Sequence, residues 1–331
     1  GKNTVCLLEA GPPDWNPFIH IPAGFIKTLY NPKINWMYEA EPTYWTANRT
    51  IDVPRGKTLG GSSSINGHIY NRGQRLDYDT WAQRGNRGWG YADILPYFKK
   101  CEQRIGIGDD TFRGRDGNLQ VTDLNYKHPL CEAFMDGAGE LGIPRNPDYN
   151  GALQEGISYV QRTTYRRRRV STARAFLNPV KKRSNLKVVT NAFVTRILLD
   201  NKTAHGVEFS KGGRGGKLSK VSAKKEVILS GGTINSPQLL QLSGIGEAAL
   251  LRSLGIEIIH ELAGVGENLR DHYAPRFCAR VKGIETINEQ SKGVKLFGEI
   301  AKYFIGGKSI LNLSPSMVYG FWHSDPVAKN N

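Results

Sequence analysis

Short apolar runs alternate with helix-like segments along this chain, and glycines stand between them. The runs 5–10 (Val-Cys-Leu-Leu-Glu-Ala) and 225–230 (Lys-Glu-Val-Ile-Leu-Ser) are typical of strands buried on both faces of a parallel sheet. Each run is followed by a glycine turn. This order of strands, turns and helices predicts an α/β fold.

Spacing and capping residues predict the other elements. Apolar residues from 129 to 141 recur at helical spacing and stop at Gly142, and Ser171 caps a short helix that ends before Pro179. The helix after the second apolar run should begin near Ser236, with Pro237 in its first turn. The predicted helices are 77–84, 91–103, 129–141, 171–177 and one from about 236; further predicted strands are 119–121, 186–190, 194–199 and 206–209, followed by a flexible tip at 212–216.

Residues 13–45 show little periodicity and are rich in aromatic side chains. This segment is predicted to form a lid with a small core of its own. Most of its rings should be packed, because each ring buries a large area. The rings are Trp15, Phe18, Phe25, Tyr30, Trp36, Tyr38, Tyr44 and Trp45.

The segment 56–67, Gly-Lys-Thr-Leu-Gly-Gly-Ser-Ser-Ser-Ile-Asn-Gly, is the most distinctive part of the chain. Adjacent glycines can take positive φ and allow a ligand close to the backbone. The serine hydroxyls and the backbone N–H groups suit a phosphate or a polar ring edge. Glu9 ends a buried-type strand, the position at which an acid binds ribose in dinucleotide folds. These residues together predict a nucleotide cofactor.

Composition adds bounds on class and partners. With 331 residues, the chain should form two packed units. Its 45 Lys and Arg against 30 Asp and Glu give a net charge of +15, with a local peak at 166–169 in a predicted exposed turn. Such a charge can attract nucleic acid, anionic lipid or an acidic partner, although a solvated basic surface is the simpler interpretation. Four separated cysteines favour a reducing compartment, and no apolar run is long enough to cross a bilayer.

Residues 56–79 resemble the first signature of the glucose–methanol–choline (GMC) flavin oxidoreductases. Gly56-Lys57, Leu59 to Ser63, Ile65-Asn66, Tyr70, Gly73 and Asp79 stand at the spacing of that family. Residues 232–246 are similar to its second signature. Supporting similarity lies at 7–11, 35–38, 171–173 and 264–272. Within the family, the chain looks most like the choline and alcohol dehydrogenases.

The resemblance implies FAD, held in a Rossmann-like domain with an inserted or appended α+β substrate domain. Some members link FAD covalently to a His at the position of Ile65, so the flavin here is expected to be non-covalent. By position, Glu9 would hold the ribose; the backbone of Thr58, Gly60, Gly61 and Ser62 would line the pyrophosphate and flavin; Asn66 and Gly67 would lie beside the isoalloxazine; Val194 would meet the adenine; and Gly231 and Gly232 would border the cofactor.

The resemblance also implies a reaction, the oxidation of a primary alcohol, choline or a similar one, by hydride transfer to flavin N5. Electrons would pass to a quinone or another acceptor. The family's base is a His paired with a second His or an Asn near its C-terminus. None of the seven histidines here matches, so the catalytic pair is expected beyond Asn331, and no metal site is predicted. His68 and His272 are interpreted as structural.

In a dinucleotide fold, a G-x-G-x-x-G turn stands about twenty residues before an acid such as Glu9, and the given sequence does not contain it. The chain is therefore expected to be a fragment that is inactive alone. The predicted FAD-binding domain is 1–272, with a lid at 13–45 and a substrate-side insertion at 101–165, and a substrate domain begins at 273. Two other functions stay open: a lyase similar to the FAD-containing hydroxynitrile lyases, and a basic module that binds nucleic acid or anions. The second is disfavoured because no recognition motif accompanies the charge. The location is predicted to be cytoplasmic, with peripheral membrane association left open and the oligomeric state not predicted.

Overall fold

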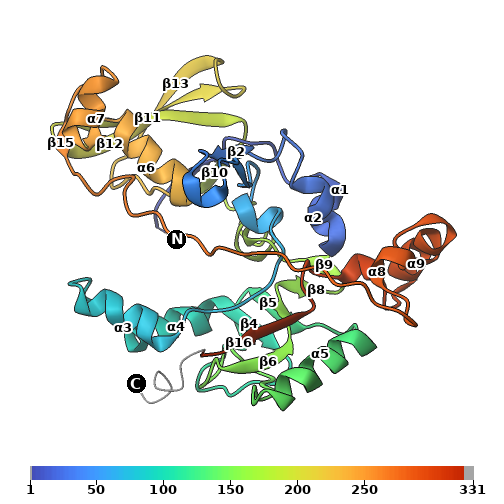
Figure 1. The fold of residues 1–331 in the computed structure, drawn as a ribbon. Coiled ribbons are helices and arrows are strands. Elements are labelled where there is room, and N and C mark those ends of the chain that lie inside the picture. Colours follow the sequence, from blue (N-terminus) through green and yellow to red (C-terminus); the bar gives the residue numbers. More distant parts are fainter. Residues whose placement is uncertain (1, 324–331) are drawn as a thin grey trace. The chain divides into compact units, whose positions relative to one another are not determined.

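The computed structural model describes residues 2–323, and the last eight residues of the predicted substrate domain lie outside this range. The chain divides into two compact units, Gly1–Pro13 with Ser184–Ile284 and Asp14–Arg183 with Glu285–Asn331. Both units mix helices and strands, which confirms the predicted α/β class (Figure 1). The functional domains 1–272 and 273–331 remain predictions, because compactness does not show which residues bind cofactor or substrate.

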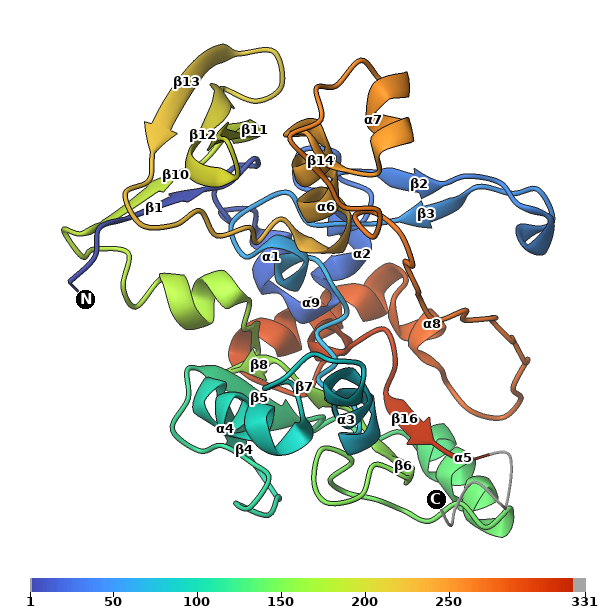
Figure 2. The same ribbon diagram turned by 90° about the vertical axis from the view of Figure 1, so that its left-hand side faces the viewer.

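The first unit is built on a parallel strand pair and an antiparallel sheet (Figure 2). β1 (Val5–Leu8) pairs in parallel with β10 (Leu186–Val189). The second sheet follows directly along the chain and turns at the glycine tip predicted between its last two strands. It consists of β11 (Ala192–Asp200), β12 (Thr203–Lys211) and β13 (Lys217–Ser222). The four strands predicted from 5 to 10 and from 186 to 209 are therefore confirmed.

A helix packs against this antiparallel sheet. α6 (Gly232–Leu242) contacts β11, and the N–H of Ile197 donates to Ser243 Oγ at 2.8 Å just beyond the helix. Gly244 then takes a φ of +81°, so a left-handed glycine follows the end of the helix. The unit closes with β14 (Ile245–Gly246), which pairs in parallel with β15 (His260–Glu261), and α7 (Ala248–Ser253) between them.

Three predictions for the first unit are wrong. Residues 225–230 form no strand, and Ile228 is 74% exposed, because their backbone finds no ladder partner within residues 2–323. The helix α6 begins at Gly232 and contains Pro237 in its interior, where the proline forfeits one helical hydrogen bond. β1 is not buried on both faces, since Val5 and Cys6 are exposed.

The described part of the second unit holds four small sheets. Strands β4 (Glu102–Ile105), β5 (Leu119–Asp123) and β7 (Gln161–Arg162) form one; the pairs are β6 (Gly156–Tyr159) with β16 (Val318–Phe321), β2 (Tyr38–Ala40) with β3 (Ile51–Val53), and β8 (Thr164–Tyr165) with β9 (Arg168–Arg169). The predicted strand at 119–121 is confirmed as part of β5. Because β16 pairs with β6, the segment after residue 285 belongs to the same compact unit as 14–183.

The helices of the second unit follow the predictions closely. Segments 77–84, 91–103 and 129–141 become α3 (Arg75–Gln83), α4 (Tyr91–Cys101) and α5 (Pro129–Glu140). Ser171 accepts from the N–H of Arg174 at 3.2 Å and precedes a π-helical turn, η4 (Ala173–Leu177). The others are α1 (Pro17–His20), α2 (Phe25–Thr28), α8 (Ile287–Gln290), α9 (Gly293–Ile305) and the 3₁₀ turns η1 (Pro22–Gly24), η2 (Tyr44–Thr46), η3 (Gly61–Ser64) and η5 (Ile310–Asn312). One core cluster comprises Leu124, Val160, Ile310 and Leu313.

The aromatic segment 13–45 is packed differently from the prediction. Its small core consists of Ile19 and Ile34 together with Ile65, whereas Trp15 and Trp45 are more than four-fifths exposed. Most of the rings therefore do not form the core. Branched aliphatic side chains, with Leu29 packed against them, fill this core instead.

Candidate functional site

The glycine segment 56–67 forms a tight loop after β3 in the second unit. Gly60 and Gly61 take φ values of +88° and +54°, in the left-handed region that favours glycine. A Cβ added to Gly60 would lie 2.5 Å from Ser64 Oγ, whereas one added to Gly61 would meet no atom within 4 Å. The backbone of Gly60 is therefore enclosed by protein, and that of Gly61 faces open space into which a ligand can approach.

Serine hydroxyls hold this loop together. Ser62 Oγ accepts from the N–H of Gly56 at 3.1 Å, and Ser64 Oγ donates to the carbonyl of Leu59 at 2.7 Å. Ser63 Oγ donates to the carbonyl of Gly60 and accepts from the N–H of Thr172 at 2.9 Å. The sequence suggested that these hydroxyls suit a phosphate, but the structure uses Ser63 and Ser64 within the protein. The loop is thus a preformed cradle whose backbone faces outward at Gly61.

Arg169 binds this loop from β9. Its guanidinium donates to Asn66 Oδ1 at 2.8 Å, to the carbonyl of Ser63 at 3.3 Å and, through Nε, to the carbonyl of Ile19 at 3.0 Å. The side chain is buried, and burial lowers the pKa of Arg169 to about 10. The predicted exposed turn at 166–169 is right for Arg166 and Arg167; Arg168 is exposed but belongs to β9, and the prediction is wrong for Arg169. Sequence reasoning missed this residue because it stands at the end of a uniform basic run.

His68 lies directly beyond the loop and is also buried. It takes a φ of +47°, with Nδ1 3.1 Å from Ser314 Oγ and Nε2 3.3 Å from the carbonyl of Pro22. Burial, together with the positive charges of Arg169 and Arg162, lowers the pKa of His68 well below its ordinary value. Both ring nitrogens therefore contact protein groups and the ring is neutral. This arrangement agrees with the structural interpretation of this histidine.

This neutral histidine predicts a pH dependence of stability. As the pH falls below about 6.5, the unfolded chain takes up a proton at His68 that the folded chain does not, so the free energy of unfolding falls by about 1.4 kcal/mol per pH unit. The variant His68→Asn keeps a polar residue that tolerates positive φ and lacks the titration. Urea unfolding of both proteins between pH about 7.5 and about 5.5 tests this. Equal pH slopes for the two proteins would contradict the assignment.

Glu9 occupies the carboxyl end of β1 in the first unit. Its carboxylate Oε1 accepts from the N–H of Gly11 at 2.8 Å, and its carbonyl accepts from the N–H of Ala192 at 2.9 Å. Ligands of open parallel sheets bind at this end of the strands. The strand β11 begins at Ala192, and its register shifts between Val194 and Arg196, which disturbs the ladder at Val194. The structure therefore brings Glu9 next to the start of the strand that carries Val194.

Gly231 and Gly232 form the N-terminal end of α6 in the same unit. Gly232 has a φ of +86°, and a Cβ added there would meet no atom within 4 Å. Backbone N–H groups at the start of an eleven-residue helix favour an anion. Both glycines are exposed. Gly232 therefore resembles Gly61 of the glycine loop: both have a left-handed backbone, and both have open space where a side chain would stand.

The ten predicted cofactor residues thus fall into two groups. Glu9, Val194, Gly231 and Gly232 belong to the first unit; Thr58, Gly60, Gly61, Ser62, Asn66 and Gly67 belong to the second. Within the second group, Thr58 is buried, and Gly67 packs so tightly that an added Cβ would lie 2.5 Å from Pro315 Cγ. Each group has backbone features that fit a dinucleotide cofactor.

A buried charge network, which the sequence did not reveal, includes Arg72, a few residues after the glycine loop. Glu102 is fully buried and accepts from Arg72 at 2.6 Å, from Arg113 Nε at 3.1 Å and from the N–H of Gly114 at 3.0 Å. Arg113 also forms an ion pair with Asp148. Burial lowers the pKa of Arg113, but the hydrogen bond and charge of Glu102 and the charge of Asp148 outweigh it and raise the pKa overall. The network therefore keeps the buried guanidinium of Arg113 charged.

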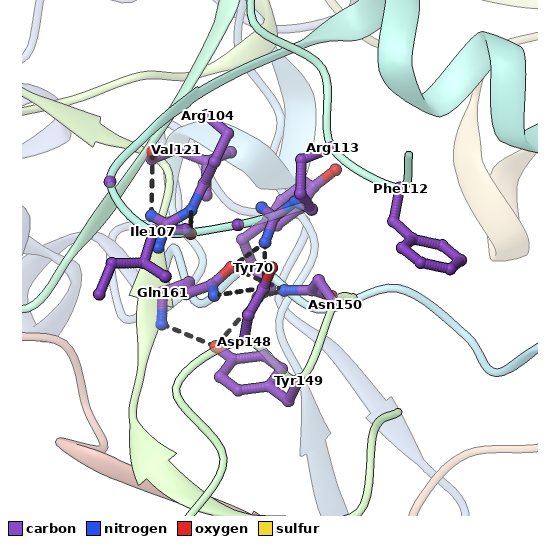
Figure 3. Close-up of polar contacts among 12 residues, drawn as sticks. Tyr70, Arg104, Ile107, Phe112, Arg113, Val121, Asp148, Tyr149, Asn150 and Gln161 are labelled. Atoms are coloured by element: carbon purple, nitrogen blue, oxygen red, sulfur yellow. Dashed lines mark hydrogen bonds and ion pairs between the residues drawn. The ribbon is translucent and has the colours of Figure 1, made fainter. Parts of the chain in front are cut away.

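The same network fixes the chain just after the glycine loop. Figure 3 shows Arg113, Asp148, Gln161 and Asn150 directed toward one another. The carbonyl of Tyr70 accepts from the hydroxyl of Tyr149 and the amide of Asn150, both at 3.1 Å. The network thus holds the carbonyl of Tyr70 and the side chain of Arg72. These bonds anchor the chain a few residues after the glycine loop.

Within residues 2–323, no three His, Cys, Asp or Glu side chains are grouped as metal ligands would be. In the same range, no helix combines the length and apolarity needed to span a membrane. His272, the other histidine interpreted as structural, is exposed, and its N–H contacts Asp271 at 2.8 Å.

An acid at the end of a parallel strand, left-handed glycines facing open space and a helix that begins at a glycine pair are features of dinucleotide-binding α/β proteins. Residues 20–274 match the GMC oxidoreductase family. The chain belongs to this family. The predicted resemblance is therefore confirmed.

Individual relatives agree with this assignment. The oxygen-dependent choline dehydrogenase of Sinorhizobium fredii is 46% identical over 271 residues, which cover 82% of this chain and 48% of that protein. The solved structure of an FAD-dependent oxidoreductase from Chaetomium thermophilum is 29% identical with a TM-score of 0.83, over 96% of this chain and 57% of that one. A formate oxidase, 24% identical, shares the fold with a TM-score of 0.86 over 99% of this chain and 59% of that one. The chain spans about half the length of the curated relatives it matches.

Proposed function

We propose that this chain is the FAD-binding part of an oxidoreductase that oxidises a primary alcohol, choline or a close analogue, to the aldehyde. The observation that carries the proposal is 46% identity to an oxygen-dependent choline dehydrogenase over 82% of the chain. The left-handed glycines Gly60 and Gly61 support a cofactor at the loop. A quinone or another acceptor would take the electrons.

FAD would supply the hydride acceptor when bound, and the residues of the chain would hold and orient it. The carboxylate of Glu9, already fixed by the N–H of Gly11, is suited to accept hydrogen bonds from ribose hydroxyls. In the second unit, the open backbone at Gly61 is suited to the pyrophosphate. In the first unit, the N–H groups at the start of α6 favour an anion, in line with the proposal that Gly231 and Gly232 border the cofactor. Asn66, whose Oδ1 is bound by Arg169, would keep a fixed orientation beside the flavin ring. The backbone of Val194 would face the adenine.

We place the catalytic histidine pair beyond Asn331, in line with the resemblance. The described histidine nearest the glycine loop in sequence, His68, is buried and neutral with both nitrogens engaged. It is therefore poorly suited to accept a proton from an alcohol. The role that we propose for the described residues is to bind and orient the cofactor.

Two measurements test the proposal. The chain should bind FAD and quench its fluorescence, and the full-length protein should lose its yellow colour when choline is added without oxygen. A full-length holoprotein that no alcohol bleaches, but that releases cyanide from a cyanohydrin, would replace the proposal with the lyase. Tight, steeply salt-dependent binding of nucleic acid without flavin binding would replace it with the basic module.

The flavin is expected to be released completely by acid precipitation of the holoprotein. The position at which some family members carry the linking His is Ile65, whose side chain is 1% exposed and packs against Ile19 and Ile34. An aliphatic side chain cannot form a bond to the flavin. The measurement is the flavin absorbance of supernatant and pellet, and colour retained on the washed pellet would contradict a non-covalent cofactor.

A further inference from the structure

Helix α9 of the second unit exposes an apolar face. Val294 and Ile305 are 86% and 84% exposed, and Phe297 and Phe304 are 73% and 70% exposed. At 3.6 residues per turn, these four positions lie along one side of the helix. An unpartnered stripe of this kind marks an interaction surface.

Polar contacts fix the helix in this orientation. Glu299 faces inward, where it accepts from the N–H of Ile310 at 2.9 Å and from Lys302 at 2.6 Å. Tyr303 is buried and donates its hydroxyl hydrogen to the carbonyl of Arg167 at 2.9 Å. Turning the helix to bury the phenylalanines would break these bonds. The exposed apolar side is therefore a fixed feature of the unit.

Positive charge predominates around this face, where the partly exposed Glu285 forms a 2.7 Å ion pair with Lys295 of α9. Lys292 and Lys308 are exposed at the two ends of α9, and its one acidic residue, Glu299, is buried on the opposite side. Arg167 donates to the carbonyl of Phe304 at 3.5 Å and so holds the basic turn, with exposed Arg166, at the C-terminal end of the helix. The apolar stripe is thus bordered by cations.

Helix α5 provides the contrast within the same unit. It exposes Phe134 (66%), and Leu141 (79%) follows its last residue. The charged residues of α5 itself, however, are all acidic (Glu132, Asp136 and Glu140), and within residues 2–323 only the first two are paired with a cation, Arg145. An anionic surface should therefore attract α9 more strongly than α5, although both expose aromatic side chains.

We propose that α9 and the turn at 166–168 dock on an anionic phospholipid surface. Apolar side chains on one face with Lys and Arg at its border are the features of helices that lie in the membrane interface. With 13 residues, α9 is shorter than the roughly 20 that a spanning helix needs, so it would lie parallel to the surface. This inference does not depend on FAD or on the alcohol.

The test is flotation of the full-length protein with vesicles. We expect the protein to float with vesicles of equal parts phosphatidylglycerol and phosphatidylcholine, and much less with phosphatidylcholine alone. The variant Phe297→Ser/Phe304→Ser should lower the bound fraction about tenfold. The variant Arg166→Gln/Lys292→Gln/Lys308→Gln should lower it several-fold at low salt, a difference that high salt removes.

The matched control is Phe134→Ser/Leu141→Ser on α5, which should float like the wild type. Flavin content and thermal midpoint report whether each variant is folded, independently of vesicle binding. Failure of the wild type to float with anionic vesicles would overturn the proposal. So would unchanged flotation of the α9 variants together with a changed oligomeric state or lower stability, because protein would then cover this face.

Discussion

Replacing Glu102 with glutamine is expected to lower the free energy of unfolding by about 3–5 kcal/mol. Glu102 is fully buried and compensates the buried guanidinium groups of Arg72 and Arg113. Glutamine preserves the shape of the side chain but leaves two cations with one carboxylate, Asp148, within the network. Urea unfolding at neutral pH measures the change.

The control for this variant is Glu132→Gln. Glu132 forms a 2.9 Å ion pair with Arg145, but both side chains are more than two-fifths exposed. Water and salt screen such a pair, so its loss should cost less than about 1 kcal/mol. If Glu102→Gln proved as mild as Glu132→Gln, the buried network would not be a major source of stability. Because the network holds residues 70–72, the affinity for FAD should also fall in the Glu102 variant.

The variant Gly61→Val should bind FAD at least about 100-fold more weakly than the wild type. Two effects add here: valine is strained at a φ of +54°, and its side chain would fill the open space that we assign to the cofactor. Flavin fluorescence titration measures the affinity, and circular dichroism checks that the variant is folded.

Gly85→Val separates the two effects. Gly85 has a φ of +98° and likewise has no atom within 4 Å of an added Cβ, but it lies outside the glycine loop. It should show similar backbone strain and unchanged FAD affinity. Equal loss of affinity in both variants would mean that strain, rather than occupation of the cofactor space, accounts for the effect.

Local signals predicted much of the fold. The helices α3, α4 and α5 begin and end within two residues of the predicted bounds, because spacing, prolines and glycines act within one turn. The strand predicted at 225–230 failed for the opposite reason. Its residues favour a strand, but a strand also needs a neighbour, and none pairs with it within residues 2–323.

The buried charges could not be predicted in this way. Glu102 and its arginines lie 11 and 30 residues apart, and nothing in the local pattern distinguishes them from solvated charges. Arg169 is one of four consecutive arginines, yet it alone is buried. Which charge is buried depends on what surrounds it in space, and a linear pattern does not contain that information.

By itself, the sequence determined the family and located the glycine loop that we propose binds the cofactor, because signature glycines record backbone conformations that other residues rarely adopt. The tertiary structure decided how that loop is held: by its own serines, by Arg169 and by the network around Glu102. It also decided that α9 turns its phenylalanines outward, since Glu299 and Tyr303 find their partners on the inner side. Conformational preference is local and can be read along the chain, whereas burial and pairing join distant residues and exist only in the folded molecule.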